Sequence, residues 1–515
     1  MAGRPVSVKI WPGAMAATVV AAIVLGTLLA VALRAEPGRG LGPSDWAAIR
    51  FTVWQALLST LFSVALAIPV ARALARRQFF GRRILVALLG APFILPVVVA
   101  VIGLLAVFGR KGVLNAVLAW LGLPEVQIYG LHGVVLAHVF FNLPLATRLI
   151  LQGWQTVPSE RFRLAAQLGF GPRDMWRIIE RPMLARVVPL AGAVIFAICL
   201  SSFAVALTLG GGPRATTVEL AIYQAFRFDF DLGKASLLAF IQLILAGSAA
   251  FLALWASKGQ GGFGKGLDRK SARWDGQSAA ARVSDFGFII IAALFLLIPL
   301  LAVGMRGVFA LPSLPASVWI AAGLSIKVAI LSASLALVLS LSIALAAVRF
   351  AWLEGVGLFA IAASPLVIGT GLFIIIFPVA APQDWALMVT ACVNAVMSMP
   401  FALRVLIPAT QDVCADYGRL SMSLGLSRWT LLRLVILPRI RGPMGFAVGL
   451  AAALSMGDLG VVALFAGTQE ATLPLQIFRL MGAYKMDAAA GAALLLATLS
   501  FGVFWICDAW GRRNA

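Results

Sequence analysis

The chain has 515 residues, of which 62% are hydrophobic and 12% are charged, and its mean hydropathy is +0.99. In soluble globular domains about a quarter of the residues are charged, so this composition excludes a soluble protein. Apolar runs of about 20 residues recur along the whole chain and must be helical, because lipid offers no partners for backbone N–H and C=O groups. The composition predicts an all-α, polytopic membrane protein.

The apolar runs predict twelve transmembrane helices in chain order. They lie at 14–33, 54–74, 84–108, 133–152, 187–209, 237–257, 286–305, 325–348, 356–378, 385–408, 442–466 and 488–508. The first run has 20 residues, whereas the core of a secretory signal has about 7–15. We therefore expect this run to be a retained membrane anchor.

The distribution of Lys and Arg predicts the orientation of these helices. If the N-terminus lies inside, the cytoplasmic segments hold 29 of the 41 Lys and Arg residues and the external segments hold 12. This bias follows the positive-inside rule and places both termini in the cytoplasm. It also explains the net charge of +21 without a nucleic-acid partner, because the cations flank helices instead of forming one patch.

Short strings repeat along the chain at a fixed offset. Asn142–Arg148 matches Ser398–Arg404 at an offset of 256, whereas Ala56–Ser59 matches Ala329–Ser332 at an offset of 273. The difference places 17 extra residues in the external segment near 109–131. We predict two parallel halves of six helices each, related by an axis along the membrane normal. The halves are residues 1–257 and 286–515, and a polar cytoplasmic linker, 258–285, joins them.

The sequence offers no catalytic or metal-binding constellation. Gly259–Gly266 fits the phosphate-loop pattern GxxxxGK, but Gly266 stands where a Ser or Thr should hold Mg²⁺, and no buried strand precedes it. The four cysteines are scattered, and His132 and His138 lack a second group of ligands, so we interpret both as polar packing positions. We therefore predict that the chain has no cofactor or metal and is not an enzyme.

Two basic loops between the predicted spans share one pattern. The first is Leu164-Ala165-Ala166-Gln167-Leu168-Gly169, with Pro182 thirteen residues after the glycine, and the second is Leu420-Ser421-Met422-Ser423-Leu424-Gly425, with Pro438 at the same spacing. The glycines allow a positive φ, and the prolines are expected to end a second short helix. The sequence predicts two cytoplasmic helix–turn–helix segments that dock into the grooves of a paired partner.

These loops resemble the EAA coupling loops of ABC importer permeases, although Leu164 and Leu420 stand at the position of the family's Glu. The resemblance implies two copies of a cytoplasmic ABC ATPase subunit, a periplasmic substrate-binding protein and a location in the bacterial inner membrane. The strings Leu136–Pro144, Leu209–Pro213, Ala215–Gln224 and Leu454–Phe465 resemble the permeases of thiamine importers and imply thiamine or its phosphate esters as the cargo.

Two other functions remain open at this point. Fused permeases for ferric iron share the same layout and loops, so the cargo depends on the strings alone. An ion-coupled secondary transporter would also be a duplicated bundle of twelve helices, but it would not explain the repeated loop.

Candidate pathway residues are few. Asp458 is the one acidic residue that we place in the interior of a predicted span, where it either attracts the thiazolium cation or pairs with helix dipoles. Asn142 and Asn394 are expected to bond across helices. Gly210, Gly211 and Gly212 predict an external gate or receptor-facing loop, or a simple turn.

Overall fold

The computed structural model describes residues 11–35, 40–90, 94–212, 215–257, 275–357, 364–467 and 471–512. Within these ranges every regular element is helical, and eleven helical runs are long and apolar enough to cross a membrane. The predicted all-α, polytopic fold is confirmed. The phosphate-loop-like motif at 259–266 lies outside the described residues.

The long helices match most of the predicted spans. They are α1 (Trp11–Arg34), α2 (Pro43–Arg76), α6 (Leu131–Thr156), α9 (Arg181–Leu200), α12 (Leu232–Ser257), α13 (Ala279–Ala310), α14 (Ala316–Ala347), α17 (Ala386–Ser423), α20 (Arg441–Met456) and α23 (Met486–Arg512). Several extend beyond the predicted bounds, because helices continue past the apolar stretch into the polar boundary.

Two predicted spans, 84–108 and 356–378, are wrong as continuous helices. The first is divided into α3 (Arg82–Leu88) and α4 (Val97–Phe108). In the second, Val356 and Gly357 are helical, Ser364 is not, and α16 (Pro365–Ile376) follows. Pro96 is the residue before α4, and Pro365 opens α16. Proline lacks an N–H and disfavours helix in the residue before it, so each helix begins afresh at its proline.

Two more predicted spans, 187–209 and 442–466, are interrupted near the ends that the sequence predicts to be external. After α9 the chain leaves the helix at Ser201–Phe203 before α10 (Ala204–Leu209), and after α20 it leaves the helix at Gly457–Leu459 before α21 (Gly460–Phe465). The two breaks are 256 residues apart. Apolarity alone did not reveal them, because the short polar interruptions lie inside hydrophobic surroundings.

A hydrogen bond recurs at equivalent places in the two halves. The Val218 N–H at the start of α11 (Val218–Arg227) donates to Thr52 Oγ1 at 2.9 Å. The Leu473 N–H at the start of α22 (Leu473–Gly482) donates to Ser325 Oγ at 2.7 Å. Thr52 and Ser325 differ by 273, the offset that the sequence predicts for this region.

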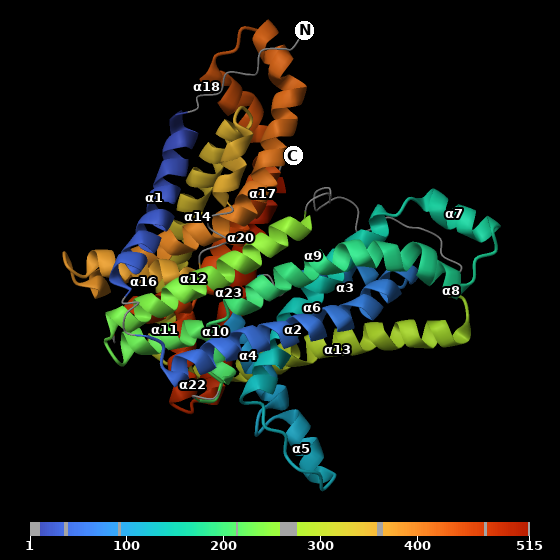
Figure 1. Cartoon of the computed structure of the whole chain (residues 1–515), viewed down its shortest axis with the longest axis horizontal. Coiled ribbons are helices and arrows are strands. Elements are labelled where there is room, and N and C mark those ends of the chain that lie inside the picture. Colours follow the sequence, from blue (N-terminus) through green and yellow to red (C-terminus); the bar gives the residue numbers. More distant parts are fainter. Residues whose placement is uncertain are drawn as a thin grey trace.

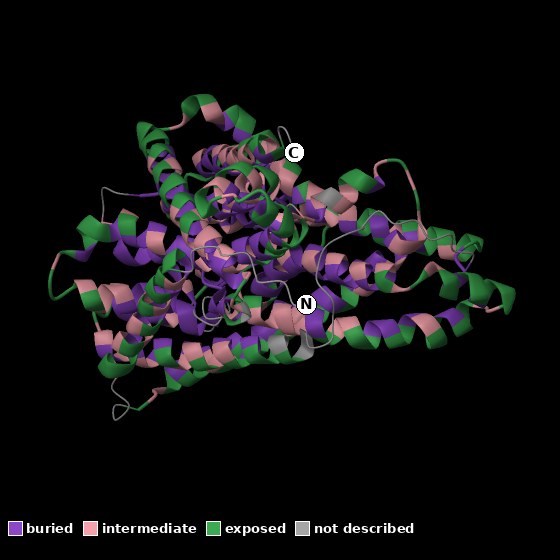
Figure 2. Ribbon diagram, turned by 90° about the horizontal axis from the view of Figure 1, so that it is seen from above, coloured by how far each residue is buried: buried purple, intermediate pink, exposed green. Residues whose placement is uncertain are grey.

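The first helix of each predicted half packs against the other half. Helix α1 lies along α14 and α16, and α13 lies along α2 and α4 (Figure 1). Large apolar side chains remain exposed along both helices, and Figure 2 shows buried residues gathered where helices meet. An exposed apolar surface of this extent suits a lipid environment, because lipid tails are as apolar as these side chains and can cover them without a free-energy cost.

The ribbons form two arms that diverge (Figure 1). One arm ends at α7 (Ser159–Gln167) and α8 (Pro172–Asp174), and the other ends at α18 (Arg428–Leu431). Helix α5 (Val113–Trp120), which lies in the predicted insertion at 109–131, projects from the opposite side of the molecule. The two repeated loops therefore lie at the ends of separate arms.

Candidate functional site

The turn in the first repeated loop has the geometry that its glycine predicts. Helix α7 is followed by Gly169 with φ +68°, and the Phe170 N–H donates to the Ala165 carbonyl at 3.0 Å. This bond reaches back over the turn to satisfy a carbonyl that the helix end would leave without a partner. The positive φ predicted for this glycine is confirmed.

The second loop ends in the same way but starts differently. Gly425 has φ +60°, and the Leu426 N–H donates to the Ser421 carbonyl at 3.0 Å. Pro158 caps α7 and separates it from α6, whereas the equivalent position, Cys414, lies inside the unbroken α17. The second loop therefore extends rigidly from a transmembrane helix.

The predicted end of the second short helix at its proline is wrong for Pro182, whereas in the second loop the helix ends at Arg439, one residue after Pro438. After α8 the chain forms a π-helix, Met175–Glu180, and then enters α9 with Pro182 in its first turn. The second loop repeats this sequence with the π-helix Leu432–Ile436, and Pro438 lies in α19 (Leu437–Arg439). The wider π register accommodates a residue that has no N–H to donate, so in the first loop the helix continues into α9.

Each loop buries one residue of its repeated string and exposes the others. Ala165 is only 3% exposed and packs against Phe162 and Met175, and Ser421 is buried at the equivalent position. The exposed residues include the apolar Leu164, Ala166 and Leu168 in one loop, which we call the first loop surface, and the apolar Leu420, Met422 and Leu424 in the other, the second loop surface. Leu164 and Leu420 are 56% and 53% exposed. Each loop therefore presents an exposed apolar side chain at the position where the EAA loops that it resembles have Glu.

Ion pairs anchor the first loop to the body of the protein. Glu180, the last residue of the first π-helix, is fully buried and lies 2.7 Å from Arg72 and 3.9 Å from Arg76 on α2. Arg76 also lies 2.6 Å from Asp275, and Arg77 lies 2.8 Å from Asp285 on α13. These ion pairs tie the first loop to α2 and, through it, to the end of the predicted linker.

The second loop is anchored by apolar contacts instead. Ile436 stands 256 residues after Glu180, is 1% exposed, and packs with Cys414, Leu431 and Ile440. Leu345 on α14 and Arg349, just after that helix, occupy the positions of Arg72 and Arg76 at the 273 offset. The two loops thus have similar turns at Gly169 and Gly425, but ion pairs anchor the first loop and apolar contacts anchor the second.

Asp458 lies in the break between α20 and α21. Its Oδ1 accepts the Gly460 N–H at 3.2 Å, while its Oδ2 is buried and makes no hydrogen bond of ordinary geometry within the described residues. The equivalent residue in the first half is Ser202, whose Oγ lies 2.6 Å from His138 Nε2. His138 Nδ1 in turn lies 3.1 Å from Ser59 Oγ, so this histidine is a satisfied polar packing position, as its sequence context indicates.

The two asparagines bond across helices as predicted. Asn142 Nδ2 on α6 donates to Cys199 Sγ on α9 at 3.2 Å, and Asn394 Nδ2 on α17 donates to Ser455 Oγ on α20 at 3.1 Å. Both bonds are buried and lie beside the helix breaks. They hold the ends of the interrupted helices in place.

The glycines after α10 form a tight turn against the segment around Tyr129. Gly211 and Gly212 have φ +72° and +130°, and a Cβ on Gly211 would lie 2.9 Å from Tyr129 Cβ. A Cβ on Gly210 would meet the Ala206 carbonyl oxygen at 2.4 Å. Only glycine fits this close approach. A role of the turn as a gate or receptor-facing loop stays a prediction.

Glu219 is a buried acid that the sequence analysis missed, because it lies in a segment predicted to be external. It is 1% exposed in the first turn of α11 and accepts hydrogen bonds from Ser364 Oγ and, at 3.5 Å, from Gln242 Nε2. Burial raises the pKa of this carboxyl to about 7, against the smaller opposing effect of the two hydrogen bonds.

The raised pKa of Glu219 predicts that the folded protein becomes less stable as the pH rises from 4.5 to about 7. The folded state keeps the proton in this window while the unfolded state releases it, so the free energy of unfolding falls as pH rises, by up to about 3 kcal/mol. We expect Glu219→Gln to remove this part of the pH dependence. Melting temperatures of the purified protein at pH 5.5 and 8 check it, and identical slopes in both proteins would contradict it.

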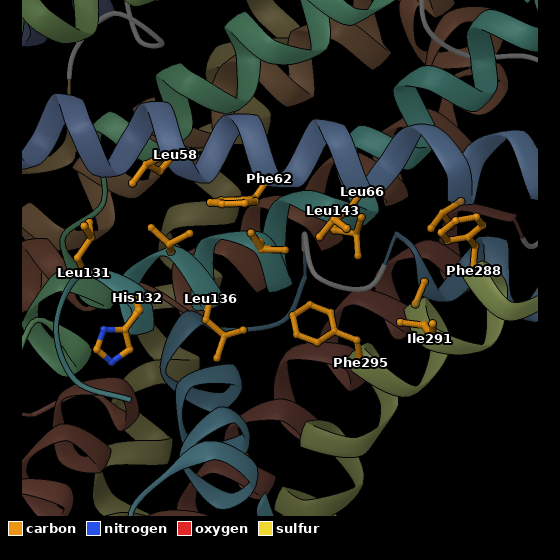
Figure 3. Close-up of a pocket in the computed structure, with 14 residues that line it drawn as sticks. Leu58, Phe62, Leu66, Leu131, His132, Leu136, Leu143, Phe288, Ile291 and Phe295 are labelled. Carbon is orange, nitrogen blue, oxygen red and sulfur yellow. The ribbon is translucent and has the colours of Figure 1, made fainter. Parts of the chain in front are cut away.

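A cavity of about 550 Å³ lies elsewhere, between α2, α6 and α13 (Figure 3). Its lining is apolar apart from His132, and Phe62 in that lining is 49% exposed. Such a cleft suits the acyl chain of a bilayer lipid and offers no counter-charge to a cation. The polar helix breaks are therefore better candidates for the transport pathway.

Comparison with known proteins gives a consistent answer. The chain is 38% identical to the thiamine transport system permease protein ThiP of Brucella abortus, over 98% of this chain and 96% of that protein. It is 38% identical to ThiP of Escherichia coli, over 98% of this chain and 97% of that protein. It is 33% identical to ThiP of Haemophilus influenzae, over 87% of this chain and 86% of that protein. No family model matches the chain.

Proposed function

The chain belongs to the family of thiamine transport system permease proteins, and from this premise we propose that it is the membrane-spanning subunit of an ABC importer for thiamine and its phosphate esters. The observation that carries the proposal is similarity over 98% of the chain to relatives named for thiamine transport. The repeated loops support the same assignment, because each presents an exposed apolar surface at the end of its own arm.

The partners in this proposal are two copies of an ABC ATPase subunit and a periplasmic substrate-binding protein. Each ATPase subunit receives one loop, residues 160–182 or 416–438, in a groove on its surface. ATP is hydrolysed in those subunits, so the permease itself is not an enzyme. Both termini belong on the cytoplasmic side with the loops, in agreement with the excess of Lys and Arg there.

The mechanism follows from the two arms. When ATP binding brings the ATPase subunits together, the first and second loop surfaces are drawn towards each other and the arms close. The helices that cross from one half to the other, α1 and α13, move with the arm on which they pack. The central pathway then opens towards the receptor, and hydrolysis returns the arms to the open arrangement of Figure 1.

Uptake into proteoliposomes tests the function. Vesicles that contain this chain and its ATPase subunit, with the receptor supplied, should accumulate radiolabelled thiamine only when ATP is present. Unlabelled thiamine phosphates should compete, and ferric iron should not. Uptake driven by an ion gradient without the ATPase subunit would reject an ABC importer, and ATP-dependent uptake of iron alone would reject the cargo.

A further inference from the structure

We propose that the permease holds the thiazolium cation of its cargo between the two helix breaks, with the Asp458 carboxylate as the counter-charge and the Phe203 ring as an aromatic partner. The proposal rests on the proposed function, because thiamine supplies an aromatic cation that a site of this composition would recognise. It assigns a cargo site to the permease itself, separate from that of the receptor.

The two breaks approach each other beside Leu366. A Cβ built on Gly460, beside the second break, would lie 3.1 Å from Leu366 Cδ1, 3.5 Å from Phe203 Cδ1 in the first break and 3.8 Å from Asp458 Oδ1. The ring and the carboxylate therefore flank one point. A Cβ on Gly457 would likewise lie 3.3 Å from Pro96 Cα, the residue before α4. The point lies between the halves, where movement of the arms can open it.

The charge of Asp458 lacks a compensating cation. No Lys or Arg nitrogen is recorded within 4.0 Å of its carboxylate in the part of the chain that the structure describes. Its neighbours are neutral donors, the first backbone N–H groups of α21 and the Asn394 amide. A carboxylate that leaves water without a counter-charge is costly, so this position favours an incoming cation.

The aromatic side of the site suits a cation that has no N–H to donate. Phe203 packs edge-on against Tyr223 with their ring centroids 5.3 Å apart, and Tyr223 packs edge-on against Phe228 at 5.9 Å. The quaternary nitrogen of a thiazolium ring cannot donate a hydrogen bond, so charge and ring faces are the contacts available to it. A metal ion would need several oxygen ligands, and the described residues contain no cluster of that kind.

The two halves carry different residues at this point, so each contributes a different group to the site. Ser202 occupies the position of Asp458 in the first half, and His138 already engages its hydroxyl. The first half therefore contributes the ring and the second half contributes the charge. A cation held by both halves would be released when the arms separate, as an alternating-access transporter requires.

The test measures thiamine imported per ATP hydrolysed in proteoliposomes with loaded receptor and ATPase subunit. We expect Asp458→Asn to lower this ratio at least tenfold while receptor-stimulated ATP hydrolysis continues, and Asp458→Glu to restore more than half of it. Phe203→Leu, which keeps apolar volume but removes the ring, should lower it several-fold. Ser202→Ala, at the equivalent position of the other half, is the matched control and should change it less than twofold.

The outcomes separate the two proposals. If the wild-type protein imports no thiamine, the proposed function fails and the site fails with it. If the wild-type protein imports thiamine and Asp458→Asn leaves the ratio unchanged, only the site is rejected. Loss of receptor-stimulated ATP hydrolysis together with uptake in Asp458→Asn would indicate a packing role and would also reject the site.

Discussion

Glu180→Ala should lower ATP-dependent uptake at least tenfold and destabilise the protein by about 3 kcal/mol, the usual cost of removing one partner of a buried ion pair. Glu180 is fully buried, and its removal leaves Arg72 and Arg76 on α2 without the carboxylate that ties them to the first loop. The loop would still bind its ATPase subunit, but its movement would no longer reach α2. Uptake and ATP hydrolysis, measured on the same vesicles, would show hydrolysis without import.

A charge swap is the control for this prediction. The double variant Arg72→Glu with Glu180→Arg re-forms the pair in reverse, so it should recover part of the uptake lost in either single variant. Ile436→Ala, at the equivalent position of the second loop, removes apolar contacts and should destabilise without changing charge. Wild-type uptake in Glu180→Ala, or a double variant no better than the singles, would show that the ion pair is not the link.

Gly425→Pro should abolish uptake while the chain remains in the membrane. Gly425 has φ +60°, whereas proline is fixed near −65°, so the second loop could not turn after α17 and its exposed surface would be displaced. The transmembrane helices precede or follow the turn and would still insert. Uptake and membrane content, determined by immunoblot, would separate the two effects.

Gly425→Asn is the control, because asparagine tolerates a positive φ better than other non-glycine residues. It should retain much of the uptake. Substitution at Ala165 is a poorer test than the sequence suggests, since a charged residue there would disrupt the packing of the first loop on itself. Ala166→Glu, on the exposed first loop surface, tests docking directly. Full uptake in both Gly425→Pro and Ala166→Glu would reject the loops as coupling elements.

Local and compositional features of this protein could be predicted from the sequence. The apolar runs predict most of the transmembrane helices, because the bilayer requires a minimum length of continuous hydrophobic helix. The turns at Gly169 and Gly425 could be predicted because a positive φ is a property of one residue and its neighbours. The repeated offset also predicted which residues correspond between the halves.

Only the tertiary structure determined which side of each loop is exposed, how each loop is anchored and where the helix breaks meet. Glu180 lies far along the chain from Arg72, and Glu219 far from Ser364, so no periodicity connects them. The burial of Ala165 and the approach of Phe203 to Gly460 likewise depend on packing between distant segments. Sequence determines local conformation and membrane partition, whereas burial and pairing depend on which surfaces the folded chain brings together.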